Sequence, residues 1–350
     1  MTSLSHVLIA CGLGVAYSAH AGGPPPPEDG PVTAAERKAA VDALATALDA
    51  NYVFPERAKA IDKMLHEHLR RGDYAKLASG AAFAQKLTED MVALVHDLHL
   101  AVGYFEHPDP VHQEATDELY LNHGIFEVRR MRFNIGYLNI NVFGALAPTA
   151  EKLGAAMRLV HDTQSLIIDL RDCHGGDTDT VPVAASYLLP ANTHLLDMYT
   201  RSTNTTERIY AKANLAGPHY PDKPVFILIG GDTASGCESF AYMMQTQKRA
   251  TVIGEHSAGA AHFGDPHKLS DHFMAFVPVG RPIDPITHGD WEGTGVIPDV
   301  PAPQATALDV AERKALQLLE PKEPSPHRRE SIQKRISELE AVPPTGSCRK

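Results

Sequence analysis

Hydrophobic residues recur at helical spacing through the N-terminal part of the chain. A capping box formed by Thr33 and Glu36 precedes an amphipathic pattern that predicts a helix. A second helical pattern opens at Pro55, and a third has its apolar positions over residues 83–94, ending at Leu94. Helices joined by such short connections predict a small N-terminal bundle.

Beyond His99 the pattern becomes that of strands alternating with helices. Residues 136–142 alternate between apolar and polar side chains, while residues 165–170 and 225–229 are continuous apolar runs typical of buried strands. Helical patterns separate these segments, at residues 150–161, 181–189 and 238–247. This alternation predicts an α/β core.

The N-terminal segment has the composition of a signal peptide. Residues 1–21 contain no Lys, Arg, Asp or Glu, and an apolar run precedes Ala19-His20-Ala21. We therefore expect export, to the periplasm or outside the cell, after cleavage near Ala21. The predicted parts are a signal peptide (1–21), a linker (22–30), an N-terminal helical domain (31–98), an α/β core (99–320) and a peripheral charged tail (321–350).

The overall composition is that of a globular protein, with 43% hydrophobic and 21% charged residues. The formal net charge of -11 argues against a nucleic-acid-binding protein, whose binding face would be basic. After the signal peptide, no apolar run approaches the roughly 18 residues of a membrane span. The sequence leaves the oligomeric state open.

Two glycine-containing segments directly follow predicted strands, where ligands of open α/β sheets tend to bind. They are residues 169–176 and 230–238. In the second, Ser235 lies between a strand and a helix, so the N–H of Gly236 can face a developing oxyanion. The surrounding residues do not form the Gly-x-Ser-x-Gly elbow. Simpler explanations exist, because Ser235 and Glu238 form a capping box and paired glycines often only build a turn.

The two segments, in this order, resemble the motifs of the tail-specific protease family, Asp-Leu-Arg-x-x-x-Gly-Gly and Thr-Ala-Ser-x-x-Glu. The general-base lysine of the processing-protease branch falls on Ala260, so the Ser/Lys dyad is absent. The chain is instead similar to the branch of the tricorn core and the interphotoreceptor retinoid-binding protein, through segments that include 97–100, 134–138 and 291–299. This resemblance implies a small helical bundle followed by a crotonase/ClpP-like core of β-β-α units.

The resemblance also implies a set of site residues. In tricorn-like members a histidine is the base and a glutamate the acidic partner, and a histidine can accept a serine proton at neutral pH. By motif, the nucleophile, base, acid and oxyanion hole fall on Ser235, His99, Glu292, and Gly236 with Gly175 or Gly176. His262 is a second candidate base. The alternatives are a packing histidine at position 99 and a loop carboxylate at position 292.

These roles imply a serine peptidase that hydrolyses peptides or exposed chain ends through an acyl-enzyme, with no metal or organic cofactor. A carrier of retinoid or fatty acid on the same fold, and an inactive scaffold, are the alternatives. The many histidines do not suggest a metal site. No His-Glu-x-x-His occurs, and His66 and His68 face different sides of a helix.

Two cysteines flank the proposed oxyanion glycines. If both loops serve one oxyanion, the sulfurs of Cys173 and Cys237 should lie close together. In an exported protein such a pair can form a disulfide. The alternative, which we favour from the sequence, is two buried thiols that fill space beside the site. Cys348 would be the thiol left over.

Overall fold

The computed structural model describes residues 29–105 and 120–341 of the chain. The predicted signal peptide, most of the linker and Cys348 lie outside these residues. The described residues form two compact units: unit 1 has residues 29–105, 198–207 and 260–283, and unit 2 has residues 120–197, 208–259 and 284–341. This division differs from the expected boundary near residue 98, because three segments of the expected core, residues 99–105, 198–207 and 260–283, group with the N-terminal helices.

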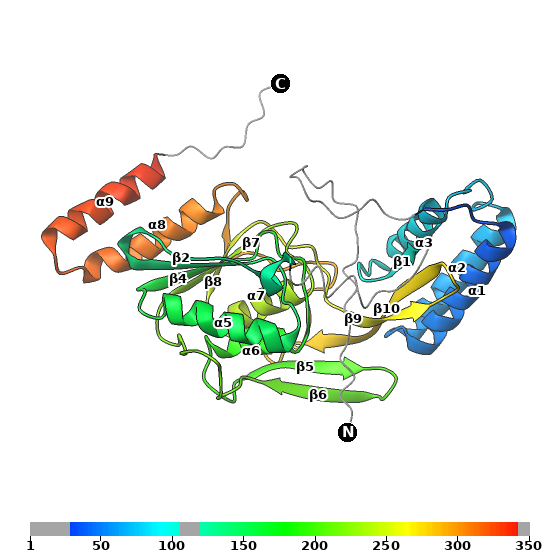
Figure 1. Cartoon of the computed structure of the whole chain (residues 1–350), viewed down its shortest axis with the longest axis horizontal. Coiled ribbons are helices and arrows are strands. Elements are labelled where there is room, and N and C mark those ends of the chain that lie inside the picture. The colour runs from blue at the N-terminus through cyan, green and yellow to red at the C-terminus, as the bar shows by residue number, and fades with distance from the viewer. Residues whose placement is uncertain (1–28, 106–119, 342–350) are drawn as a thin grey trace. The chain divides into compact units, whose positions relative to one another are not determined.

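Unit 1 begins with the predicted helices, shown in blue and cyan in Figure 1: α1 (Ala34–Asn51), α2 (Pro55–Arg71) and α3 (Gly80–Val95). The capping box is confirmed, since the Thr33 N–H donates to Glu36 at 2.7 Å and the Glu36 N–H donates to Thr33 at 3.2 Å. α2 ends at Gly72, whose φ of 78° favours glycine. One position was wrong: Leu94 is 44% exposed, and Val95 is buried instead.

Antiparallel strands from later in the sequence complete unit 1: β1 (Ala101–Tyr104), β9 (Phe263–Lys268) and β10 (Phe273–Ile283). β10 pairs with both β1 and β9. Phe273, Ala275 and Val277 lie on one face of β10 and join the core formed by the helices. This burial explains why residues 260–283 belong with the N-terminal bundle.

β5 (His194–Thr200) and β6 (Thr205–Tyr210) form a hairpin. The tip of this hairpin, residues 198–207, belongs to unit 1. Arg201 fixes this tip, because its backbone N–H donates to Val279 at 3.0 Å and its guanidinium donates to the Tyr52 carbonyl at 2.6 Å.

Unit 2 is built around a sheet in the order β11-β8-β7-β4-β3-β2. Its strands are β2 (Ile125–Arg130), β3 (Ile135–Ile140), β4 (Ser165–Asp169), β7 (Val225–Ile229), β8 (Thr251–Gly254) and β11 (Val300–Pro301). β3, β4, β7, β8 and β11 run parallel, and β2 is antiparallel to β3. The carboxyl ends of β4 and β7 therefore meet at one edge, which brings residues 169–176 and 230–238 together.

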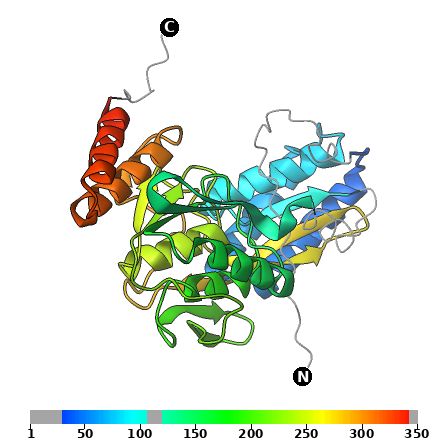
Figure 2. The ribbon, with the colours of Figure 1, turned by 60° about the vertical axis from the view of Figure 1, so that its left-hand side comes forward.

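Helices cover both faces of this sheet (Figures 1 and 2). One face carries α5 (Leu146–Val160), α6 (Thr180–Ser186) and α7 (Gly236–Thr246), and the other carries α8 (Ala307–Leu319) and α9 (Pro326–Glu340). Short 3-10 turns lie at Asn122–Gly124, Arg132–Asn134 and Glu320–Lys322. This double cover explains why β3, whose apolar and polar residues alternate in the sequence, is buried at every position except Asn139.

The C-terminal tail is less peripheral than its charged sequence predicts. Ile332 and Leu339 of α9 are buried in the same hydrophobic cluster as Leu316 of α8 and Ile167 of β4. α9 therefore extends the core of unit 2.

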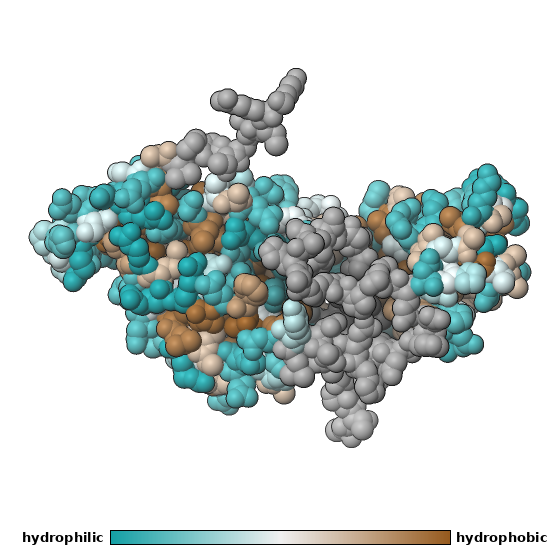
Figure 3. Space-filling model, turned by 45° about the horizontal axis from the view of Figure 1, so that its top comes forward, coloured by the Kyte–Doolittle hydropathy of each residue, from teal (hydrophilic) through white to brown (hydrophobic). Residues whose placement is uncertain are grey.

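Among the described residues, no helix has both the length and the apolar character needed to cross a bilayer. On the face shown in Figure 3, hydrophobic residues of unit 2 form patches divided by hydrophilic ones. Scattered exposed apolar residues, such as Leu159 at 71% exposure, are normal on protein surfaces.

Candidate active site

Ser235 occupies the turn between β7 and α7 in a conformation that non-glycine residues rarely adopt. Its φ is 52° and its ψ is -119°. Such strain costs about 1–3 kcal/mol and persists only where the surrounding structure holds it. A serine on a strained strand-to-helix turn is the geometry of a nucleophile elbow, in which the hydroxyl stands exposed at the edge of a sheet. Sequence reasoning missed this conformation because the usual flanking glycines are replaced by Thr233 and Cys237.

Buried Thr233 fixes this turn. Its hydroxyl donates to the Leu170 carbonyl at 2.7 Å and accepts the Gly230 N–H at 2.9 Å. The Ala234 N–H donates to the Cys173 carbonyl at 2.9 Å. The Ser235 turn is therefore tied to the loop that follows β4.

That loop brings Gly175 and Gly176 against Ser235. Their φ angles are 117° and 133°, and a Cβ on Gly175 would lie 2.8 Å from the Ser235 Cβ, so glycine is required for this approach. The Gly175 N–H donates to Cys237 Sγ at 3.1 Å. Within the part of the chain that the structure describes, the N–H groups of Gly176 and Gly236 donate to no protein acceptor. These two groups are therefore the ones available to an oxyanion.

Cys173 and Cys237 form a disulfide, with their Cα atoms 6.0 Å apart. The expectation of two buried thiols was therefore wrong. The bond joins the loop after β4 to the first turn of α7, and both residues are fully buried. The sequence could not reveal this pairing, because glycine-rich loops leave side-chain directions undetermined.

In unit 1, Asp97 holds both candidate base histidines. Its Oδ1 accepts the backbone N–H of His99 at 3.1 Å, and its Oδ2 contacts the imidazole Nδ1 of His262 at 2.7 Å. Oδ2 also accepts the Tyr52 hydroxyl at 3.0 Å. All four residues are buried. Sequence reasoning included Asp97 only as part of a motif and missed Tyr52, although an acid two residues before a candidate base was the available signal.

Burial controls the acid–base state of His99. It lowers the pKa of His99 to about 4, with a smaller opposing effect from the charge of Asp97. The imidazole is therefore neutral at pH 7, which is the form that accepts a proton. Burial would raise the pKa of Asp97, but the hydrogen bond from His262 and the charges of His262 and His99 outweigh it and lower that pKa.

Glu292 lies in a turn of unit 2 and is partly exposed. Its N–H donates to Asp290 at 2.9 Å, and the next N–H, of Gly293, donates to the Gly259 carbonyl at 2.8 Å. Trp291 is buried beside it. The Glu292 turn is thereby joined to the loop after β8.

The structure thus groups the predicted residues in two sets. Within unit 2 it brings Ser235 together with Gly175, Gly176 and Gly236. Within unit 1 it brings His99 and His262 together on Asp97.

The two histidines of α2 do not converge on one point. His66 contacts Asp62 at 2.6 Å and Asp42 at 3.1 Å, whereas His68 contacts Asp90 at 3.1 Å. They face separate carboxylates, as their spacing predicts, and do not form a common ligand pair for a metal.

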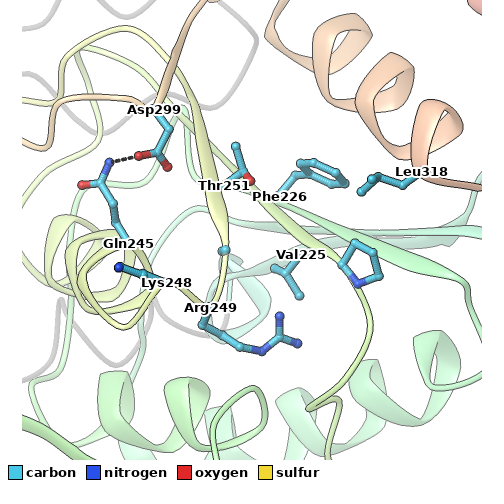
Figure 4. Close-up of a pocket in the computed structure, with 10 residues that line it drawn as sticks. Val225, Phe226, Gln245, Lys248, Arg249, Thr251, Asp299 and Leu318 are labelled. Atoms are coloured by element: carbon cyan, nitrogen blue, oxygen red, sulfur yellow. Dashed lines mark hydrogen bonds between the residues drawn. The ribbon is translucent and has the colours of Figure 1, made fainter.

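A groove of about 340 Å³ lies at the end of β7 opposite to Ser235 (Figure 4). Its lining mixes apolar Phe226 with charged Arg249 and Asp299. Arg249 and Asp299 already have protein partners: Gln245 donates to Asp299 at 2.9 Å, and the Arg249 guanidinium donates to backbone carbonyls. This mixed lining differs from the apolar cavity that a retinoid or fatty acid favours.

Comparison with known protein families identifies two matching models. The model of peptidase family S41 matches residues 134–302. The model of the N-terminal domain of peptidase S41 in eukaryotic IRBP matches residues 33–124. Together they cover the N-terminal helices and most of the sheet core.

The chain is also similar to curated processing peptidases. It is 27% identical over 175 residues to the chloroplastic carboxyl-terminal-processing peptidase 2 of Arabidopsis thaliana, covering 50% of this chain and 33% of that protein. It is 29% identical over 168 residues to the carboxyl-terminal-processing protease of a Synechocystis species, covering 47% of this chain and 37% of that protein. The chain thus spans about a third of the length of these relatives.

Solved structures share the fold. A putative peptidase from Parabacteroides merdae aligns over 79% of this chain and 92% of its own, with a TM-score of 0.53 and 18% identity. A lipoprotein from Streptococcus agalactiae aligns over 80% of this chain and 96% of its own, with a TM-score of 0.55 and 14% identity.

Proposed function

The chain belongs to peptidase family S41, and from that membership we propose that it is a serine peptidase with Ser235 as its nucleophile. The observation that carries the proposal is the strained Ser235 turn beside the N–H groups of Gly176 and Gly236. A helix cap alone has no need of this strain, whereas a nucleophile gains exposure and nearby oxyanion donors from it.

In the proposed reaction, Ser235 Oγ attacks the carbonyl carbon of a peptide bond while His99 takes the hydroxyl proton. The carbonyl oxygen becomes an oxyanion that accepts the N–H groups of Gly176 and Gly236. When the C–N bond breaks, His99 returns the proton to the leaving amine. Water then attacks the acyl-enzyme as His99 accepts its proton. When the bond between the acyl carbon and Ser235 Oγ breaks, His99 returns that proton to Oγ, which releases the product acid and regenerates Ser235.

Glu292 is the proposed acidic partner that orients the imidazole of His99 and stabilises its protonated form. Ala260 stands where the processing branch has lysine, which favours a histidine base. His262 is the second candidate for that role. Its contact with Asp97 through Nδ1 would fix a tautomer that leaves Nε2 able to accept a proton.

We propose extended peptides or exposed chain ends as substrates, cleaved outside the cytoplasm. The N-terminal segment supports export, and a disulfide is the form that two adjacent cysteines take in an oxidising compartment. Sequencing of the mature protein should find its N-terminus near Gly22. A mature chain that still begins at Met1 would contradict export by cleavage.

A carrier of apolar ligands is the second candidate function. It is favoured by the match of the N-terminal helices to the model from eukaryotic IRBP. The mixed lining of the groove in Figure 4 argues against that groove as a retinoid or fatty-acid site.

One experiment distinguishes the two candidates. The purified protein is treated with a fluorophosphonate probe, and labelled peptides are mapped by mass spectrometry. Labelling at Ser235 that is absent in Ser235→Ala supports the peptidase. Saturable binding of retinol or a fatty acid without labelling would overturn the peptidase proposal and favour the carrier.

A further inference from the structure

Glu238 is a fully buried carboxylate in the first turn of α7, three residues after Ser235. Its Oε2 accepts the Ser235 N–H at 2.9 Å. Its Oε1 accepts the Ser257 hydroxyl at 2.6 Å and the Gly259 N–H at 2.7 Å. Glu36, the acid of the capping box of α1, is partly exposed and accepts hydrogen bonds from Thr33 alone, from its N–H and its hydroxyl. Glu238 therefore has contacts that helix capping does not explain.

The first contact is made to the strained residue itself. A backbone at φ 52° and ψ -119° relaxes unless its neighbours hold it. The bond from the Ser235 N–H to a buried carboxylate is charge-assisted, and such bonds are about twice as strong as neutral ones. Glu238 thus holds the backbone that aims the nucleophile.

The other two contacts lead toward the Glu292 turn. Ser257 Oγ donates to Glu238 and accepts the Val296 N–H at 2.6 Å. Gly259 donates its N–H to Glu238, and its carbonyl accepts the Gly293 N–H at 2.8 Å. The segment 293–296, directly after Glu292, is therefore joined to Glu238 through two short paths.

We propose that Glu238 is a positioning residue that holds the Ser235 turn and the Glu292 turn in one fixed arrangement. It acts through the backbone of Ser235 and through the loop 257–259, and it takes no part in proton transfer. The proposal rests on the peptidase function proposed above. It assigns Glu238 a role in turnover, where the capping-box explanation assigns it only helix stability.

The test compares Glu238→Gln with a matched control, Glu36→Gln, which makes the same change in the capping box of α1. In Glu238→Gln the amide N–H₂ must face a donor, either the Ser235 N–H or the pair from Ser257 and Gly259. We expect kcat and the rate of fluorophosphonate labelling to fall together by about 100-fold, because a misplacement of about 1 Å has that effect. KM should change less than about threefold, and Glu36→Gln should keep full activity.

Ser257→Ala provides a second variant should Glu238→Gln fail to fold. This variant keeps the Glu238 carboxylate but removes the link to Val296, and it should lower kcat by a smaller factor than Glu238→Gln does. Equal kcat values for Glu238→Gln and wild type, or equal losses in Glu238→Gln and Glu36→Gln, would overturn the proposal.

Amide hydrogen exchange separates this proposal from the peptidase function on which it rests. Glu238→Gln should accelerate exchange at the amides of Ser235, Gly259, Gly293 and Val296 together. Faster exchange at Ser235 alone overturns the proposed coupling. Absence of fluorophosphonate labelling in the wild-type protein contradicts the peptidase function, and the exchange data still decide whether Glu238 joins the two turns.

Discussion

The backbone N–H of Gly175 donates to Cys237 Sγ at 3.1 Å, and Cys237 is itself bonded to Cys173. This contact indicates which of two adjacent glycines, Gly175 or Gly176, has a backbone N–H available to an oxyanion. Gly175 is occupied by the sulfur, so Gly176 is left as the donor for an oxyanion. The disulfide therefore fixes the loop after β4 and, in the proposed mechanism, leaves the oxyanion to Gly176.

Loss of the disulfide should weaken both the fold and the site. The bond closes a loop between residues 64 positions apart, so Cys173→Ser with Cys237→Ser should lower the free energy of unfolding by about 2–4 kcal/mol in denaturant titrations. Turnover should fall as well, because the loop that carries Gly176 loses its tether. Alkylation of denatured, unreduced protein should leave both cysteines unmodified, and modification at both would contradict the bond.

The fold of unit 2 follows largely from local pattern. The continuous apolar runs at β4 and β7 predict strands buried on both faces, and both strands are fully buried. The position of residues 260–283 could not be predicted in this way. Phe273 and Val277 pack on helices from the start of the chain, and such long-range contacts leave no local periodic signal.

Removal of the Ser235 hydroxyl should abolish turnover and leave the fold intact. Ser235→Ala is expected to lower kcat by at least about a thousandfold with a peptide library as substrate, because nothing else replaces the nucleophile. The free energy of unfolding should change by about 1 kcal/mol at most. Ser165→Ala is the matched control, since that buried hydroxyl on β4 has no hydrogen-bond partner among the described residues. Full activity of Ser235→Ala would reject the serine mechanism.

The pH dependence of turnover should report the buried histidine. The sequence alone predicts an ordinary histidine with activity rising near pH 6–7, whereas burial lowers the pKa of His99 to about 4. Because the base must be neutral, kcat/KM should rise with pH through about 4 and be level by pH 6. A profile that rises only above about pH 8, or full activity in His99→Ala, would contradict His99 as base, and His262→Ala would then be tested.

The same depressed pKa affects stability. Between pH 6.5 and about 4 the unfolded chain binds a proton at His99 that the folded protein does not. The free energy of unfolding should therefore decrease as the pH falls through this window. Urea titrations at several pH values would measure it, and His99→Phe should lose this dependence.

Some of the candidate site residues lie in a recognisable sequence motif, and others have no such local signal. Ser235 and the glycine pair could be found because each lies in a loop directly after a predicted strand and matches a family motif. The contact between Asp97 and His262 joins residues 165 positions apart, and the burial of Glu238 depends on the loop 257–259. Neither relationship has a local sequence pattern, since it exists only once distant segments have packed.

Asp97 should contribute more to stability than any one of its partners. Asp97→Asn places an amide N–H₂ against donors from Tyr52, His99 and His262, and breaking such a buried cluster costs about 3–5 kcal/mol. Tyr52→Phe removes a single bond to a charged group and should cost about 1.5–3 kcal/mol. Since the pKa of Asp97 is lowered, the contribution of this residue to the free energy of unfolding is present above about pH 4 and is lost at more acid pH. Equal losses for the two variants at pH 7 would contradict this order.

Gly176 should be irreplaceable for a reason that Gly231 does not share. At φ 133° an L side chain is strained, and a Cβ on Gly176 would lie 2.1 Å from the Phe143 carbonyl oxygen, so Gly176→Ala must move the backbone. That movement displaces the proposed oxyanion donor, and loss of one donor lowers kcat by about 100- to 1,000-fold. A Cβ on Gly231 meets nothing within 4 Å, so Gly231→Ala in the same edge of the sheet should keep wild-type kcat. Because the displaced N–H matters most when charge develops on the substrate, KM should change far less than kcat in Gly176→Ala. A folded Gly176→Ala protein with full kcat would remove Gly176 from the oxyanion hole.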